Sequence, residues 1–151
     1  MADQIIIDLE KVFGRAILLS AYQAEKSGTD TLLVMAQTDI PLFLAHLDPL
    51  IGELEGAFST RLEQIQTTET TLTVSLKEDV ISTEGLNRIE KALMDGLTSG
   101  VLSQYQAGAK GYEGVQAYNR KRFDDALRTI NNVSVFRVKP KDKIRITQRT
   151  L

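Results

Sequence analysis

The feature that most constrains the fold is the helical spacing of apolar residues along most of the chain. After Ser82, apolar side chains recur every three or four residues: Leu86, Ile89, Leu93, Leu97, Val101 and Tyr105. Ser82 is a favoured N-cap because its hydroxyl can accept a hydrogen bond from a backbone N–H of the first turn. The pattern predicts a long amphipathic helix over Ser82–Tyr105.

Two segments upstream show the same spacing. An apolar stripe predicts a first helix over Asp3–Glu25: Ile5, Leu9, Val12, Phe13 and Ala16. A second helical region is expected to begin near Asp39 and to continue to Ile65, on the stripe Leu47, Ile51, Leu54, Phe58, Leu62 and Ile65. Asp48-Pro49 predicts a kink or a restart within it, because proline cannot donate the helical hydrogen bond.

Downstream of Tyr105, glycines at 108, 111 and 114 predict a hinge between helices. A fourth helix is expected over Tyr112–Ile130, ended by Asn131-Asn132. The spacing Gly96-x-x-x-Gly100 indicates tight contact between helices. Glycines 108, 111 and 114 also resemble a phosphate-binding loop, but they follow a helix rather than a strand.

Two segments follow the period of a strand. Leu72, Val74 and Leu76 alternate with polar residues, which predicts a short strand near residues 70–76. Residues 133–138 and 143–147 are rich in β-branched residues and flank a turn signal at 139–142, which predicts a C-terminal β-hairpin or extended strand tail. The predicted fold is therefore mainly α, a bundle of about four helices with this strand and tail.

Charge divides the chain at the same boundary. The net charge of −2 is the sum of +5 in residues 133–151 and −7 in the remaining 132 residues. We therefore expect one domain with a helical body, residues 1–132, and a basic strand-like tail, residues 133–151, that docks on a negative partner. The predicted docking residues are Val133, Val135, Phe136, Arg137, Val138, Lys139, Lys143, Ile144, Arg145, Ile146 and Arg149.

The chain shows no catalytic motif. It has no cysteine and one histidine, His46, which is not surrounded by further metal ligands. It lacks the glycine-rich nucleotide loops and the nucleophile elbow. We therefore expect no enzyme activity, no cofactor and no metal, while an enzyme with a site assembled from dispersed carboxylates such as Glu53, Glu63 and Glu90 stays an alternative.

A membrane partner and an export signal are not expected either. The longest apolar runs, such as Ile5-Ile6-Ile7, are far too short to span a bilayer. The N-terminal region carries acidic residues where a signal peptide would carry basic ones.

A second basic cluster lies in the fourth predicted helix. Arg120, Lys121 and Arg122, between Tyr118 and Phe123, are possible DNA-facing residues. A solvated helix face is the plain alternative, since the sequence pI of about 5.5 is low for a dedicated nucleic-acid binder.

The element order resembles the small head-to-tail connector proteins (neck or adaptor proteins) of tailed bacteriophages. The similar stretch runs from Ser82-Thr83-Glu84-Gly85-Leu86 to Asp124-Asp125-Ala126-Leu127, about one third of the chain. The resemblance implies a virion protein without enzyme activity, which forms a homo-oligomeric ring between the portal and the tail or neck proteins. DNA would pass as a non-specific contact.

The leading hypothesis is therefore a structural assembly protein, a head-tail connector whose tail docks on an adjacent copy or on the next ring. The alternative is a cytoplasmic helical adaptor or regulator that binds nucleic acid through its basic tail and Arg120–Arg122.

Overall fold

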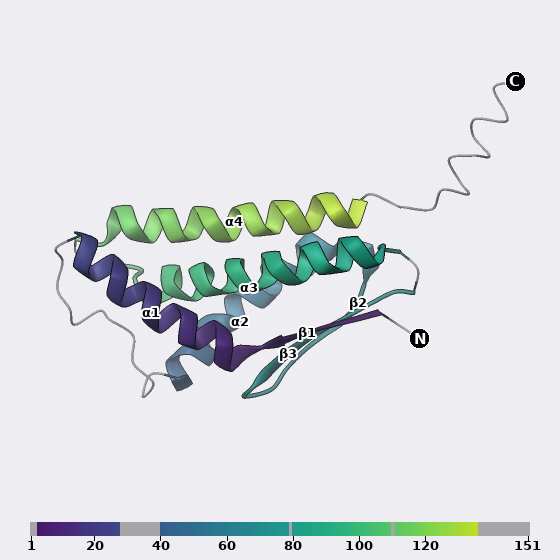
Figure 1. The fold of residues 1–151 in the computed structure, drawn as a ribbon, viewed down its shortest axis with the longest axis horizontal. Helices are drawn as coiled ribbons and strands as arrows, with labels where there is room; N and C mark the ends of the chain where they lie inside the picture. Colours follow the sequence, from purple (N-terminus) through teal and green to yellow (C-terminus); the bar gives the residue numbers. More distant parts are fainter. Residues whose placement is uncertain (1–2, 28–39, 79, 110, 136–151) are drawn as a thin grey trace, which may run out of the picture.

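A computed structural model describes residues 3–27, 40–78, 80–109 and 111–135; the backbone alone is described at Ser27, Ser134 and Val135. In this part of the chain, four α-helices pack with a three-stranded antiparallel sheet (Figure 1). The mainly helical class with a small β component is thus confirmed. The predicted hairpin tail lies almost wholly outside the described residues.

The first segment corrects the predicted helix over Asp3–Glu25. Residues Asp3–Asp8 form strand β1, and helix α1 begins only at Leu9 and ends at Ser27. Ile5 and Ile7 are buried while Ile6 is 58% exposed, which is the alternation of a strand with one covered face. Ile5 also fits the helical stripe of α1, so the two periods overlap at this boundary.

Helix α2, Ile40–Phe58, runs through Pro49 without a restart, while the alternative of a kink at Pro49 stays a prediction. The predicted continuation of the helix to Ile65 was wrong. Ser59 adopts a left-handed backbone with φ +56°, and a short 3₁₀ turn η3, Ser59–Arg61, follows. Strand β2, Leu62–Thr67, then takes up the last two apolar residues of the expected stripe.

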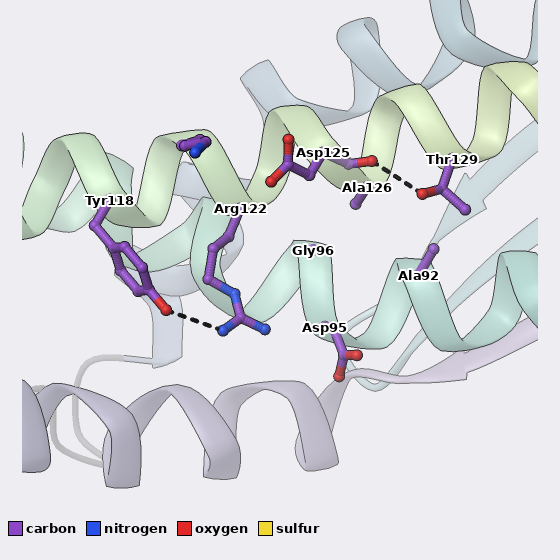
Figure 2. Close-up of a pocket in the computed structure, with 9 residues that line it drawn as sticks. Ala92, Asp95, Gly96, Tyr118, Arg122, Asp125, Ala126 and Thr129 are labelled. Atoms are coloured by element: carbon purple, nitrogen blue, oxygen red, sulfur yellow. Dashed lines mark hydrogen bonds between the residues drawn. The ribbon is translucent and has the colours of Figure 1, made fainter.

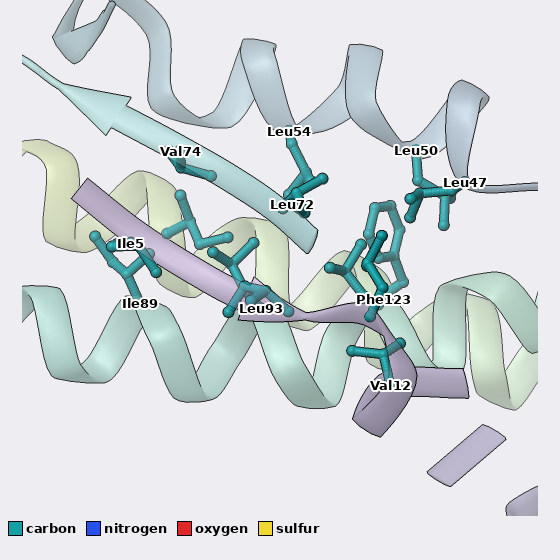
Figure 3. Close-up of a cluster of buried hydrophobic side chains, with 14 of the residues drawn as sticks. Ile5, Val12, Leu47, Leu50, Leu54, Leu72, Val74, Ile89, Leu93 and Phe123 are labelled. Carbon is teal, nitrogen blue, oxygen red and sulfur yellow. The ribbon is translucent and has the colours of Figure 1, made fainter. Parts of the chain in front are cut away.

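Strand β3, Thr71–Leu76, confirms the strand expected near residues 70–76. It lies between the two others in the order β1-β3-β2, with Ile5 opposite Val74 and Ile65 opposite Val74 on its other side. A tight turn joins β2 and β3, where the Thr71 N–H donates to the Thr68 hydroxyl at 3.0 Å. The buried residues of β3 face the helices (Figure 3).

Helix α3, Thr83–Tyr105, begins at the predicted cap, since the Ser82 hydroxyl accepts a hydrogen bond from the Gly85 N–H at 3.0 Å. It is the centre of the body and packs against α1, α2, α4 and β1. Buried side chains from the four α-helices and from β1 and β3 meet in the core beside it (Figure 3). Its predicted apolar stripe is buried from Ile89 to Val101, with Leu86 and Tyr105 partly covered.

Helix α4, Glu113–Val135, lies antiparallel to α3 (Figure 1). Gly108 and Gly111 in the turn between them have φ values of +76° and +86°, a region that glycine enters without strain. The predicted close contact at Gly96 and Gly100 is confirmed, because a Cβ built at Gly96 would lie 2.4 Å from Ala126 Cβ.

The end of α4 corrects the boundary of the tail. Asn131-Asn132 does not end the helix, which continues to Val135. Val133 is 7% exposed and belongs to the core, next to Gly85 of α3. Val133 and Val135 are therefore part of helix α4 and not of a strand, and the side chain of Val133 continues the buried apolar face of the helix.

Candidate interaction surfaces

The three predicted DNA-facing cations have different surroundings. Arg120 forms a bidentate ion pair with Glu53 of α2, in which Nη1 donates to Oε2 at 2.9 Å, and its Nη2 lies 3.0 Å from Asp124. The hydrogen bond that Arg120 donates to Glu53 raises the pKa of Arg120, while burial acts to lower it. Arg120 thus joins α2 to α4, whereas Lys121 and Arg122 are exposed.

Arg122 lines three hollows formed by α1, α3 and α4. The largest, about 660 Å³, is lined mainly by Leu19, Tyr22, Val115 and Tyr118, with Lys26 and Arg122 at its walls. Two hollows of about 400 and 380 Å³ extend it over α3, and Asp95 lines both of them. We call these three hollows together the α1–α4 groove; Figure 2 shows the part between α3 and α4, with Asp95, Tyr118 and Arg122.

Exposed apolar side chains gather along the α1–α4 groove. In the described part of the chain, five large hydrophobic residues are strongly exposed: Ile6, Leu18, Tyr22, Leu42 and Tyr118. Leu18, Tyr22 and Tyr118 all line the groove, at 73%, 56% and 54% exposure. A cluster of this kind on an otherwise polar surface is typical of a binding face.

The α1–α4 groove is also cationic. Lys26 and Arg122 lie over the rings of Tyr22 and Tyr118, at 5.7 and 5.9 Å from the ring centroids. Arg122 Nη1 also donates to the Tyr118 hydroxyl at 3.3 Å (Figure 2). The Asp95 carboxylate in the groove already accepts from Arg15 at 2.7 Å, so it does not neutralise Lys26 or Arg122.

A closed network of three side-chain amides fixes this end of the body. Asn119 Nδ2 donates to Gln23 Oε1 and to Gln106 Oε1, each at 2.9 Å. Gln23 Nε2 donates back to Asn119 Oδ1 at 2.9 Å, and Gln106 Nε2 to Gln23 Oε1 at 3.3 Å. All three residues are buried, so the network holds α1, α4 and the end of α3 in one arrangement beside the groove.

The sheet offers a second surface. In the described residues, β1 and β2 each pair with β3 alone, so each has one edge without a strand partner. Asp3 and Asp8 lie at the ends of β1, and Glu63 lies in β2. An open edge is a template for another extended segment.

The side chains considered for catalysis do not converge in the described part of the chain. Among those residues, no group of three or more His, Asp or Glu is placed to hold a metal ion. His46 is half-buried on α2, and its ring meets Tyr105 edge to face at 6.1 Å between centroids. Burial lowers the pKa of His46. Glu53 is bound to Arg120.

The remaining tail residues predicted to dock, from Phe136 to Arg149, lie outside the described residues. No described helix is long and apolar enough to cross a bilayer. Sequence reasoning missed the α1–α4 groove. The available signal was Leu18, Tyr22 and Tyr118, which lie off the apolar stripes of their helices.

Comparison with known proteins gives no relative for this chain. No family model matches it, and neither the curated proteins nor the solved structures contain a match.

Proposed function

We propose that this chain is a structural assembly subunit whose copies join into a ring, in the manner of the head-tail connectors of tailed bacteriophages. It would sit in the virion neck, between the portal and the tail or neck proteins, and would perform no catalysis. DNA would pass it as a non-specific contact. Its action is geometric: the helical body supplies the wall of the ring, and the tail of one copy docks on the next.

The open sheet edges are the observation that carries this proposal. The tail sequence Lys143-Ile144-Arg145-Ile146-Thr147 alternates cations with apolar residues at strand spacing. The open edge of β1 has Asp3 and Asp8 at its ends, so its charge is opposite to that of the tail. A strand added there would gain main-chain hydrogen bonds as well as charge pairing.

The length of the tail permits docking on a neighbour. Residues 136–151 follow the end of α4 and would span roughly 50 Å when extended. Helix α4 has 23 residues, or about 35 Å at the helical rise. The tail can thus reach past the body to which it is attached.

Deletion of residues 136–151 tests the proposal. The cut must follow Val135, because removal of Val133 would open the core. We expect the truncated chain to keep its helix content by circular dichroism and to lose assembly, with the native mass of a single chain. A truncated chain that assembles like the full-length chain would contradict the proposal.

A second variant separates strand pairing from charge. Ile144→Pro with Ile146→Pro keeps every cation but removes two backbone N–H donors. Loss of assembly in this variant supports docking on a sheet edge. Normal assembly would mean that the tail acts through charge alone.

The exposed pair Lys121 and Arg122 beside Tyr118 favours one other function, a cytoplasmic adaptor that binds nucleic acid with these residues and the tail. That function predicts binding to single-stranded DNA that weakens steeply with salt. Absence of binding at low salt would remove it.

A further inference from the structure

We propose that the α1–α4 groove receives the exposed ridge of helix α2 from a second copy of this chain. This ridge, called the α2 ridge, is formed by Leu42, Ala45, Asp48, Gly52 and Glu55. The inference rests on the proposed function, since it names the contact by which neighbouring bodies meet. It concerns a surface separate from the tail and the sheet edges.

The first argument is the distribution of exposed apolar residues. Leu42 is 50% exposed and is the large hydrophobic side chain that α2 presents to solvent. The described part of the chain has four other strongly exposed large hydrophobic residues, and three of them, Leu18, Tyr22 and Tyr118, line the groove. Two apolar surfaces on one chain can cover each other when copies associate.

The α2 ridge has the shape of a helix that enters a groove. Its members recur every three or four residues, so they share one face, opposite the buried face of α2. Ala45 and Gly52 at its centre are small, and outside the backbone of α2 no described atom lies within 4 Å of a Cβ built at Gly52. Within the described residues, no side chain therefore excludes close approach of a neighbour at Gly52.

The second argument is charge complementarity. Helix α2 contains no Lys or Arg, and its exposed acids are Asp48 and Glu55, roughly 10 Å apart along the helix. The apolar part of the groove has Lys26 on one wall and Arg122 on the other. An acidic, apolar ridge therefore matches a cationic, apolar groove.

The positions of the two surfaces allow the contact to repeat. In Figure 1, α1 lies in front of α3 and α2 lies behind it. The groove is lined by α1 and α4, and the ridge belongs to α2. One copy thus presents its groove and its α2 ridge on different sides. A contact between unlike surfaces is heterologous and generates a ring when the rotation closes.

The charges in the groove disfavour two other occupants. The tail has a net charge of +5 from Val133 onward, so Lys26 and Arg122 would repel it. A nucleic acid strand gains affinity mainly from many phosphate contacts, and Arg15 in the groove is already paired with Asp95. The α2 ridge carries acids that match the cations of the groove and an apolar side chain that matches its apolar lining.

A charge exchange between copies tests this contact. Lys26→Glu/Arg122→Glu reverses the groove, and Asp48→Lys/Glu55→Lys reverses the ridge. We expect each variant alone to show the native mass of a single chain at a concentration where the wild-type chain is assembled. An equimolar mixture should assemble again with the two variants alternating, because each reversed surface then faces a surface of opposite charge.

Matched variants control for charge itself. Arg88→Glu/Lys91→Glu and Glu84→Lys/Glu90→Lys make the same changes of charge at exposed positions of α3, outside both surfaces. They should assemble like the wild-type chain. Circular dichroism of every variant should show unchanged helix content.

The outcomes separate this contact from the proposed function. A wild-type chain that stays monomeric overturns both. A wild-type oligomer that Lys26→Glu/Arg122→Glu leaves intact overturns the groove contact alone. Failure of the mixture to assemble overturns the α2 ridge as occupant. The groove contact is also overturned if the wild-type chain binds single-stranded DNA, Lys26→Glu/Arg122→Glu abolishes this binding, and Asp48→Lys/Glu55→Lys keeps it, while both variants have the native mass of the wild-type chain. That result would assign the groove to nucleic acid.

Discussion

At the scale of single residues, the amide network has the largest consequence for stability. Asn119 is fully buried and bonds to both Gln23 and Gln106. Asn119→Ala removes the acceptor of Gln23 Nε2 and the donor to Gln106 Oε1. Loss of a hydrogen-bond partner at a buried polar group costs about 1–3 kcal/mol. We expect the variant to lose about 3 kcal/mol of unfolding free energy, measured by urea denaturation.

The matched control is Gln116→Ala on the same helix. Gln116 is half-buried and makes one side-chain bond, to the Ser103 carbonyl at 3.3 Å. Its loss should cost less than about 1 kcal/mol. Equal losses for Gln116→Ala and Asn119→Ala would show that the network adds nothing beyond single hydrogen bonds.

His46 gives the fold a dependence on pH. Burial lowers its pKa in the folded chain below the ordinary value near 6.5, so the unfolded chain binds a proton more readily. Neutral His46 therefore does not reduce the free energy of unfolding above a pH of about 6.5, and the free energy of unfolding decreases as the pH falls through and below that value. We expect His46→Gln to flatten the fall in denaturation midpoint between neutral and mildly acidic pH. An unchanged pH profile would argue against this role of His46.

At the scale of elements, the sequence predicted helices well and their ends poorly. The cap at Ser82 and the alternation of Leu72, Val74 and Leu76 are local signals, and both were right. The errors at β1, β2 and the end of α4 arose where apolar residues fit two periods. For β1 and β2, pairing with β3 favours a strand over a helix. This pairing depends on residues outside the segment itself, so the spacing within the segment does not reveal it.

The candidate surfaces were less predictable than the elements. The α1–α4 groove joins residues from three helices, so no spacing along one helix reveals it. Arg120 looked equivalent to Arg122 in the sequence, but packing placed Glu53 of α2 beside it. Only the three-dimensional arrangement distinguishes a cation that joins two helices from one that is exposed.

The contact between α3 and α4 leads to a prediction at this scale. A Cβ built at Gly100 would lie 2.8 Å from Phe123 Cδ1 and 2.9 Å from Leu50 Cδ1. Gly100→Ala should therefore overpack the core and lower the unfolding free energy by about 1–3 kcal/mol.

Gly14→Ala on α1 is the control for this contact. A Cβ at Gly14 meets no atom within 4 Å, so this variant should gain about 0.5–1 kcal/mol in urea denaturation. A gain for Gly100→Ala as well would mean that α3 and α4 can separate without cost.

At the scale of the whole molecule, two kinds of contact would hold the proposed ring, and both join opposite charges. The tail carries +5 and the rest of the chain −7, and the α1–α4 groove is cationic where the α2 ridge is acidic. Charges at the rim of an interface are screened within about 10 Å at 0.1 M salt and about 3 Å at 1 M. The body itself is held by a buried apolar core, which screening does not weaken.

Assembly and folding should therefore respond differently to sodium chloride. Between about 0.1 M and about 1 M salt, we expect the assembled fraction to fall at a fixed chain concentration, because the charge pairs between copies are screened. The unfolding midpoint of the chain truncated after Val135 should change little over the same range. Native mass and thermal unfolding measure the two quantities on matched samples. Assembly that is constant or stronger at high salt would show that apolar contacts dominate between copies, since burial of apolar surface is not weakened by screening.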